Sequence, residues 1–204
     1  MFYSLFIINM EVMLMSGQVN LVGKIVSGFE KSHSLYGETF YNVTICVKRE
    51  SGNLDLVPLL ISDRLINMSV QYKDVHITGD IRSYNQRDTE KSRLKVYIFV
   101  NSIESIDEEE NINDILIEGY VCKPPVYRRT PLGREITDLM LASNRAYNKS
   151  DYIPCIVWGR NAVYSKNLNT GDRVRVEGRL QSREYTKDNE VKTTYELSVK
   201  LLEV

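Results

Sequence analysis

The apolar residues of this chain recur mostly at every second position, which is the spacing typical of β-strands. Between residues 172 and 185, Val174, Val176 and Leu180 alternate with polar and charged residues. Alternation of this kind buries one face of a strand and leaves the other in water. The pattern predicts five strands in the second half of the chain, near 115–122, 135–145, 152–158, 172–185 and 191–202, and five in the first half, near 19–27, 39–49, 55–61, 74–84 and 93–103.

A short helix is predicted between the third and fourth strands of each half, near 63–70 and 161–168. In the second of these, Asn161 is a candidate N-cap, and Ala162, Val163 and Leu168 form an apolar face. The segment Pro131-Leu132-Gly133 predicts a hairpin turn, because glycine can adopt a positive φ.

The two halves of the chain repeat one another. A shift of 96 positions aligns several pairs, and after three inserted residues Gly79 aligns with Gly178. Gly79 follows a Val-x-Ile-x segment, and Gly178 follows a Val-x-Val-x segment. The pairs aligned by the first shift are Gly23 with Gly119, Gly37 with Gly133, Arg49 with Arg145, Asp55 with Asp151, Pro58 with Pro154 and Arg64 with Arg160. Three strands, a helix and two strands is the order of the OB-fold barrel, and a glycine in the fourth strand suits a bend around such a barrel. The sequence therefore predicts an all-β protein with two tandem OB-folds, each with a short helix between strands 3 and 4.

The domain boundaries follow from this repeat. Residues 16–104 are predicted to form the first OB-fold, the acidic run 105–114 a linker, and residues 115–204 the second OB-fold. Residues 1–15 form an apolar tail that lacks the basic segment and the cleavage site of a signal peptide, and several methionines within it are alternative starts. No other segment is long and apolar enough to span a bilayer, so the expectation is a cytoplasmic protein without a membrane partner.

The charge is distributed unequally between the halves. Residues 1–110 contain 11 Lys and Arg against 15 Asp and Glu, whereas residues 111–204 contain 15 against 12. Only the second half has a net positive charge, which favours binding to the negatively charged backbone of a nucleic acid. The three cysteines are an odd number in apolar segments, which favours buried thiols, and the two histidines lie far apart. We therefore expect no metal site, no cofactor and no histidine-based catalysis.

Aromatic and basic residues occur together in the second half. OB-folds bind single strands with a basic groove and aromatic side chains on which bases stack. The alternative is that these aromatic residues fill the barrel, and for Trp158 burial is an open possibility because it follows the apolar run Cys155-Ile156-Val157. The aromatic residues concerned are Tyr120, Tyr127, Tyr147, Tyr152, Trp158, Tyr164, Tyr185 and Tyr195.

Four segments of the second half resemble the bacterial single-stranded-DNA-binding protein family. They are Thr130–Glu135, Leu141–Arg145, Val157–Ala162 and, most specifically, Gly171–Tyr185 with its Val-x-Val-Glu-Gly-Arg-Leu-Gln block. The resemblance covers about residues 115–204. It implies an OB-fold that binds single-stranded DNA without chemistry, and hence no enzymatic activity and no small-molecule substrate.

The resemblance also implies the binding residues. The family stacks bases at four positions, which in this sequence are Tyr147, Tyr152, Trp158 and Tyr185. The basic residues expected to neutralise phosphates are Arg128, Arg129, Arg134, Arg145, Lys149, Arg160, Arg179 and Arg183.

Two departures from the family pattern change the expectation. The chain stops at Val204 without the acidic tail through which family members recruit other proteins. In the first half, the positions that match Tyr147, Tyr152 and Trp158 are occupied by Ser51, Leu56 and Ser62, although Tyr84 lies near the place of Tyr185. The first OB-fold is therefore expected to serve as a pairing or scaffolding domain, with a homodimer supplying four OB-folds.

Three alternatives remain open on the sequence. One is a primosomal or adaptor OB-fold protein that acts mainly through protein contacts. A metal-dependent nuclease would need clustered carboxylates, whereas those in this sequence are scattered. RNA is a possible ligand, since stacking tolerates either sugar.

Overall fold

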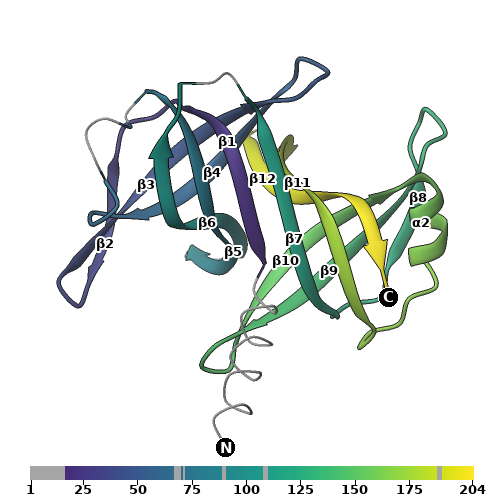
Figure 1. The fold of residues 1–204 in the computed structure, drawn as a ribbon. Helices are drawn as coiled ribbons and strands as arrows, with labels where there is room; N and C mark the ends of the chain where they lie inside the picture. The colour runs from purple at the N-terminus through teal and green to yellow at the C-terminus, as the bar shows by residue number, and fades with distance from the viewer. Residues whose placement is uncertain (1–16, 67–69, 71, 89–90, 108–109, 188–189) are drawn as a thin grey trace, which may run out of the picture. The chain divides into compact units, whose positions relative to one another are not determined.

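The computed structural model describes residues 17–204 with the exception of 67–69, 71, 89–90, 108–109 and 188–189 (Figure 1). The N-terminal segment 1–15 thus lies outside the described residues. The described chain is built of β-strands and one α-helix of seven residues, α2 (Gly159–Ser165). The predicted all-β class is confirmed. No described helix has the length and apolarity that crossing a bilayer would require.

Six strands come from the first half of the chain. They are β1 (Gln18–Ile25), β2 (Glu30–Leu35), β3 (Glu38–Lys48), β4 (Leu54–Ser62), β5 (Asp74–Asp88) and β6 (Lys91–Ser105). β1 pairs antiparallel with β3 and with β5, β3 pairs with β4, β4 runs parallel to β6, and β6 pairs with β5. These five pairings close a circuit of five strands. β2 lies outside the circuit and pairs only with β3 among the strands whose register is described.

The second half repeats this arrangement with β7 (Ile112–Val121), β8 (Val126–Arg129), β9 (Glu135–Arg145), β10 (Lys149–Trp158), β11 (Arg173–Lys187) and β12 (Glu190–Glu203). β7 pairs with β9 and β11, β9 with β10, β10 runs parallel to β12, and β12 neighbours β11. α2 lies between β10 and β11, as Figure 1 shows near the C-terminal end of the chain. Alternate residues of each circuit point inward and are fully buried, for example Ile45 and Ile77 in the first and Leu141 and Ile153 in the second.

The predicted strands agree with the observed ones to within a few residues, but two short strands were missed. β2 and β8 have no buried residue, so neither carries the alternation by which strands were recognised. The predicted turn at Pro131-Leu132-Gly133 does join β8 to β9, with Gly133 at φ 77 and the amide of Thr130 bonded to the carbonyl of Arg134.

The helix predictions need two corrections. α2 begins earlier than expected, and its N-cap is Trp158, which makes no side-chain capping bond, rather than Asn161. The Asn161 side chain instead donates to the carbonyl of Lys200, at 3.4 Å. In the first half, the residues after β4 form turns over 63–65, and residues 67–69 of the predicted helix lie outside the described range.

The glycines that repeat along the sequence occupy equivalent crowded positions. A Cβ at Gly23 would lie less than 3.0 Å from the carbonyl of Cys46, and a Cβ at Gly119 would lie 2.7 Å from that of Ala142. Gly79 and Gly178 face the carbonyls of Phe99 and Ser198 in the same way. The residues that the glycines contact are repeated as well: Cys46 and Ala142 are 96 residues apart, like their two glycines, and Phe99 and Ser198 are 99 apart. Each glycine lets two backbones approach more closely than any side chain would permit.

The contacts divide the chain into two compact units, and these units are not simply the residues before and after the predicted linker 105–114. One unit comprises Ile115–Arg179 and Glu196–Val204, and the other comprises Gln18–Asp114 together with Leu180–Tyr195. The outer parts of β11 and β12 therefore pack with the first half of the chain. Asn113 of β7 fixes this segment, because its buried side chain both donates to the carbonyl of Leu180, at 2.9 Å, and accepts from its amide, at 3.0 Å. The end of the acidic run is thus part of a strand, not of a solvated spacer.

We expect Gly178→Ala to lower the free energy of unfolding by about 1–3 kcal/mol, the usual effect of forcing an atom into a packed site. The new methyl group would press on the Ser198 carbonyl, which is backbone and cannot rotate away. Gly28→Ala is the matched control, because nothing lies within 4 Å of its Cβ position. Urea denaturation of both variants measures the effect, and equal stability of the two would contradict it.

Candidate nucleic-acid interface

The outer face of β10 carries two of the four predicted aromatic platforms. Ile153, Cys155 and Val157 point into the core and are 0–3% exposed, so their neighbours Tyr152 and Trp158 point outward, with 45% and 36% of their surface exposed. The two rings lie on the same face, six residues apart, which is about 20 Å along a strand. The open question about Trp158 is therefore answered: it is not a core residue.

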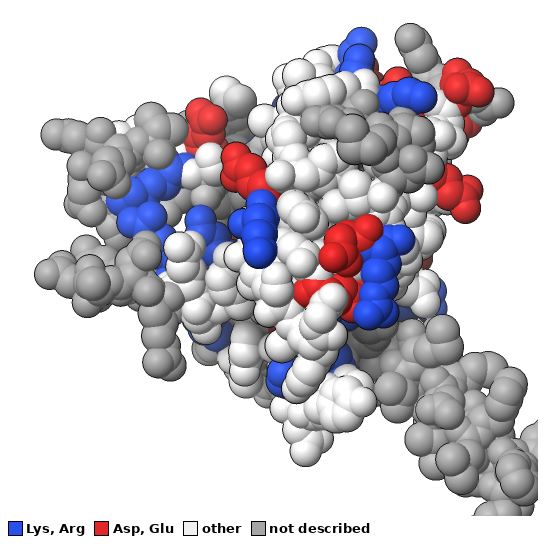
Figure 2. Space-filling view, turned by 90° about the vertical axis from the view of Figure 1, so that its left-hand side faces the viewer, with Lys and Arg blue, Asp and Glu red and all other residues white. Residues whose placement is uncertain are grey.

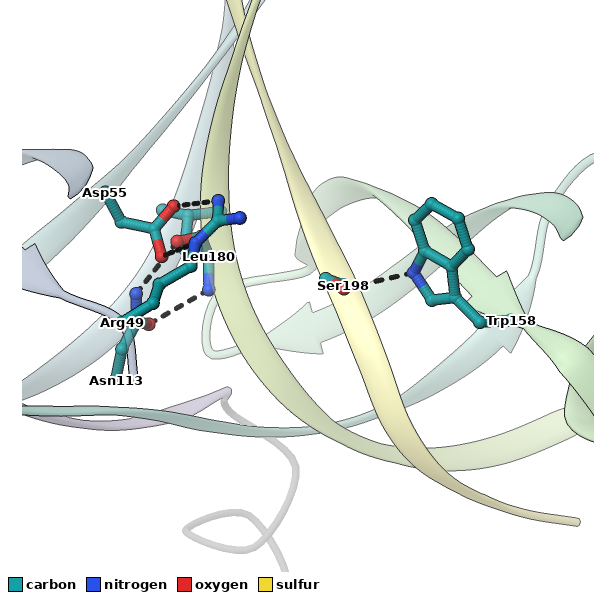
Figure 3. Close-up of polar contacts among 6 residues, drawn as sticks. All are labelled: Arg49, Asp55, Asn113, Trp158, Leu180 and Ser198. Carbon is teal, nitrogen blue, oxygen red and sulfur yellow. Dashed lines mark hydrogen bonds and ion pairs between the residues drawn. The ribbon is translucent and has the colours of Figure 1, made fainter. Parts of the chain in front are cut away.

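The indole of Trp158 is held in one orientation by a neighbouring strand. Its Nε1–H donates to the hydroxyl of Ser198 on β12, at 3.1 Å (Figure 3). Ser198 pairs in register with Ile156, next to the tryptophan along the outer face of β10. One edge of the indole is thus satisfied by the protein, while a substantial part of the ring remains accessible to a ligand.

Tyr147 lies at the tip of the hairpin that joins β9 to β10, and it is 94% exposed. Its φ of 62° and the φ of 53° at Asn148 place two consecutive non-glycine residues in the left-handed region. For an ordinary side chain this conformation costs about 1–2 kcal/mol. The equivalent positions of the first half are Ser51 and Gly52, and there glycine takes the positive φ of 83°. The strained turn of the second half presents an aromatic ring to solvent, which is the kind of outlier that marks functional positions.

The fourth predicted platform, Tyr185, is 39% exposed and lies on β11. It falls in the segment Leu180–Tyr195, which belongs to the unit formed with the first half of the chain. The structure therefore brings Tyr147, Tyr152 and Trp158 together along β10 and its hairpin, and it places Tyr185 and Arg183 in the other unit.

Three of the predicted phosphate-binding cations are engaged by carboxylates. Arg128 donates twice to Asp138, at 2.7 and 3.1 Å, and Arg129 donates to Glu135 at 3.2 Å. The bond to Asp138 raises the pKa of the Arg128 guanidinium above its ordinary value. The third, Arg145, is 3.2 Å from Asp151. These pairs weaken the case for a phosphate role, since each arginine already faces a negative charge.

The other predicted cations differ in accessibility. Arg134, Lys149 and Arg160 are exposed, as is Arg183, whereas Arg179 is half-buried. Lys149 pairs in register with Arg145 at the turn end of the β9–β10 hairpin, next to Tyr147. Lys149 is thus the exposed cation that lies nearest in the chain to two aromatic platforms.

The ion pair of Arg145 is itself part of the internal repeat. In the first half, Arg49 and Asp55 occupy the equivalent positions, and the guanidinium donates from Nε at 2.8 Å and from a terminal nitrogen to the two carboxylate oxygens (Figure 3). This bond raises the pKa of Arg49. Both aspartates are buried, with side chains 1% and 5% exposed, while the arginines remain partly accessible. The repeated Arg and Asp are a structural clamp between the second and third strands of each circuit.

The sequence analysis missed the residues that lie between the platforms. Met140 and Ala142 of β9 face Pro154 and Tyr152 across the ladder, so the strip next to Tyr152 is apolar. Nearer Trp158, Ile156 faces Asp138, which is paired with Arg128. In the first half the corresponding row on β4 is aliphatic, with Leu54 and Leu56 exposed by 57% and 43%. This row on β10 could have been found from the sequence, because every second residue of a strand lies on the same face, here residues 152, 154, 156 and 158.

Charge alone does not identify a binding face on the first half. Figure 2, which views the molecule from the side of β2 and β3, shows basic and acidic residues interspersed among uncharged ones on the described surface. Among the residues that the structure describes, no group of three His, Cys, Asp or Glu side chains is arranged to hold a metal ion. Burial raises the pKa of the Cys155 thiol, as expected for an unreactive core cysteine.

These features define a class of protein: an all-β protein with closed circuits of strands and solvent-exposed aromatic rings on an outer strand face. The wild-type single-stranded DNA binding protein from Thermus aquaticus has a similar fold, with a TM-score of 0.75 at 18% identity over 92% of this chain and 91% of that one. A deletion mutant of the same protein gives a TM-score of 0.72 over 92% and 93% of the two chains.

The second half of the sequence is similar to a known family. Residues 112–204 match the Single-strand binding protein family. Single-stranded DNA-binding protein 1 of Staphylococcus aureus is 37% identical over 81 residues, which are 36% of this chain and 48% of that protein. Single-stranded DNA-binding protein A of Bacillus subtilis is 35% identical over 81 residues, 36% and 47% of the two. The chain spans about half the length of these curated relatives.

We expect Asp151→Asn to lower the free energy of unfolding by about 3 kcal/mol or more, because it leaves a partly buried arginine without its counter-charge. Asp138→Asn removes the partner of Arg128 at the surface, where both side chains are at least 40% exposed, and should change stability by less than about 1 kcal/mol. Denaturant titration compares the two. Similar effects at both sites would show that Arg145 does not depend on Asp151.

Proposed function

We propose that this protein binds single-stranded DNA with little sequence preference, through the outer face of β10 and the tip of the β9–β10 hairpin. The observation that carries the proposal is the exposed row of Tyr147, Tyr152 and Trp158 on the half that matches the Single-strand binding protein family. Exposed rings on a rigid strand offer π-faces to unpaired bases, and every base can stack on them. Duplex DNA keeps its bases stacked inside the helix, so it is a poor ligand for such a row.

The mechanism is binding without chemistry. Stacking on the three rings supplies affinity, and exposed cations such as Lys149, Arg134 and Arg160 neutralise phosphates and release counterions. Because Arg128, Arg129 and Arg145 are engaged by carboxylates, they contribute less than the sequence suggests. Bound strands would be protected during replication, recombination or repair. RNA is an alternative ligand, since stacking does not distinguish the sugars.

The finer architecture belongs to the same proposal. Both strand circuits have the order of an OB-fold, which supports two tandem OB-folds, the second with α2 between its third and fourth strands. A homodimer would then supply four OB-folds. The exposed Leu54 and Leu56 on β4 support a protein-contact role for part of the first half, because aliphatic rows are typical of contact surfaces. The adaptor alternative is the case in which such contacts, not DNA, are the main activity.

Single-stranded DNA should quench the fluorescence of Trp158, the only tryptophan of the chain, because a stacked base replaces water on the exposed part of the indole. Titration with oligo-dT at low salt measures the effect, and a duplex of the same length is the control. Emission that does not change at saturating oligonucleotide would remove Trp158 from the binding face.

Replacing Tyr147 and Tyr152 together by Ala should weaken binding by about 2–6 kcal/mol, since each lost platform costs about 1–3 kcal/mol. Tyr164→Ala is the control, because this tyrosine is 56% exposed but lies on α2. Fluorescence anisotropy gives the affinities, and circular dichroism shows whether the variants fold. Wild-type affinity in a folded double variant would reject these platforms.

The affinity should fall with salt, by a slope of about −0.7 in log K against log salt for each phosphate neutralised on a single strand. Lys149→Ala should make this slope shallower by about one such unit, because Lys149 is exposed beside the platforms. Arg128→Ala should alter it less, since Asp138 already offsets that charge. The reverse order of the two variants would contradict the assignment of the cations.

A further inference from the structure

Ser198 of β12 lies on the outer side of its strand but is almost completely covered. Its neighbours Leu197 and Val199 are core residues that point inward, so the side chain of Ser198 points outward, and yet Ser198 is only 4% exposed. The indole of Trp158 meets its hydroxyl, with 3.1 Å between Nε1 and Oγ, and contributes to this cover (Figure 3). Ser198 therefore has almost no surface of its own to offer to a ligand.

The contact between Trp158 and Ser198 crosses the ladder of β10 and β12 diagonally. The register partner of Ser198 on β10 is Ile156, and Trp158 lies two residues further along the same outer face. The indole therefore turns back over β12 to reach the hydroxyl. This orientation needs a small side chain at position 198, because a large one would occupy the space that the ring fills.

The first half of the chain exchanges the two residue types. The residues that face each other on β4 and β6 are the equivalents of those on β10 and β12, and there Phe99 occupies the position of Ser198. The position of Trp158 is occupied by Ser62. Each half thus has one aromatic residue and one serine at these two positions, but on opposite strands. The exchange indicates that this part of the outer face accommodates one ring and not two.

The ring of the first half has other partners than the ring of the second half. The guanidinium of Arg82 lies over Phe99, 3.8 Å from the ring centroid, and Phe40 contacts Phe99 with 6.0 Å between centroids. Trp158 is instead held at its edge, through Nε1, and keeps 36% of its surface exposed. A bond at the edge of a ring fixes its orientation and leaves its π-surface available.

We infer that Ser198 is a positioning residue for the candidate nucleic-acid interface: its hydroxyl fixes the indole of Trp158 in the orientation in which a base stacks on it. This inference rests on the proposed function, in which Trp158 is one of three platforms. A ring that is already fixed loses little freedom when a strand binds, so the ordering of this side chain subtracts little from the affinity. Because Ser198 is buried, it acts on binding through the indole and not through a contact with DNA.

The test is a double-mutant cycle on the affinity for labelled oligo-dT, measured by fluorescence anisotropy at low salt. Ser198→Ala should weaken binding by roughly two- to tenfold, the usual effect of having to order one side chain on binding. In a Trp158→Phe background, which has no indole N–H, the same substitution should change the affinity no further. Ser165→Ala is the matched control, because its hydroxyl is also buried in the second half but donates to the carbonyl of Ala162, at 3.3 Å.

The protein without DNA gives a second readout, the motion of the indole. Time-resolved fluorescence anisotropy of Trp158, the only tryptophan, should show faster local rotation in Ser198→Ala than in the wild type or in Ser165→Ala. In the wild type, NMR should show slow exchange of the indole N–H with solvent, since this group is bonded to a buried hydroxyl. The exchange measurement needs no variant, so it decides the question if Ser198→Ala does not fold. Exchange as fast as that of a free indole would overturn the inference.

Failure of the inference and failure of the proposed function give different results. If the wild type binds oligo-dT and a folded Ser198→Ala variant binds it equally well, Ser198 does not position the ring and the proposed function stands. The same conclusion follows if Ser198→Ala weakens binding as much in the Trp158→Phe background as in the wild type, because the effect then does not pass through the indole N–H. If the wild type binds no oligo-dT, the proposed function itself is rejected.

Discussion

The candidate interface depends on one constraint, which is that β10 is hydrogen-bonded to a neighbouring strand on each side, β9 and β12. β9 fixes β10 in antiparallel register from Lys149 to Trp158, and β12 fixes its second part in parallel register. A shift of one residue would turn Ile153 and Val157 to solvent and the aromatic rings into the core. Because the strand cannot shift without losing both ladders, the exposure of Tyr152 and Trp158 follows from the closure of the circuit.

The two halves keep the same skeleton and differ on their outer faces. The crowded glycines and the buried Arg–Asp clamp recur at equivalent positions, since each is required wherever two backbones approach closely or a carboxylate is buried between strands. The outer side chains are under no such requirement. On β10 they include Tyr and Trp, and at the matching positions of β4 they are Leu and Ser. The same scaffold, present in both halves, therefore carries two surfaces with different chemistry.

Much of the candidate site could be predicted from the sequence, but not its electrostatics. Tyr147, Tyr152 and Trp158 were found from the family resemblance, and all three are exposed. The predicted cations were found by residue type alone. Asp138, Glu135 and Asp151 offset three of them, and such pairing depends on which strands lie side by side. The assignment of Tyr185 to a different unit likewise follows from long-range contacts that local pattern does not contain.

The sequence by itself determined the strand class, the repeat, the positions of most strands and the residue types available for stacking, because alternation and glycine spacing are local properties of a chain. Tertiary structure alone decided which carboxylate meets which arginine, how the indole of Trp158 is held by Ser198, and that the outer parts of β11 and β12 pack with the first half. Those features arise where residues distant in sequence are brought within a few ångströms, and no local pattern specifies that distance.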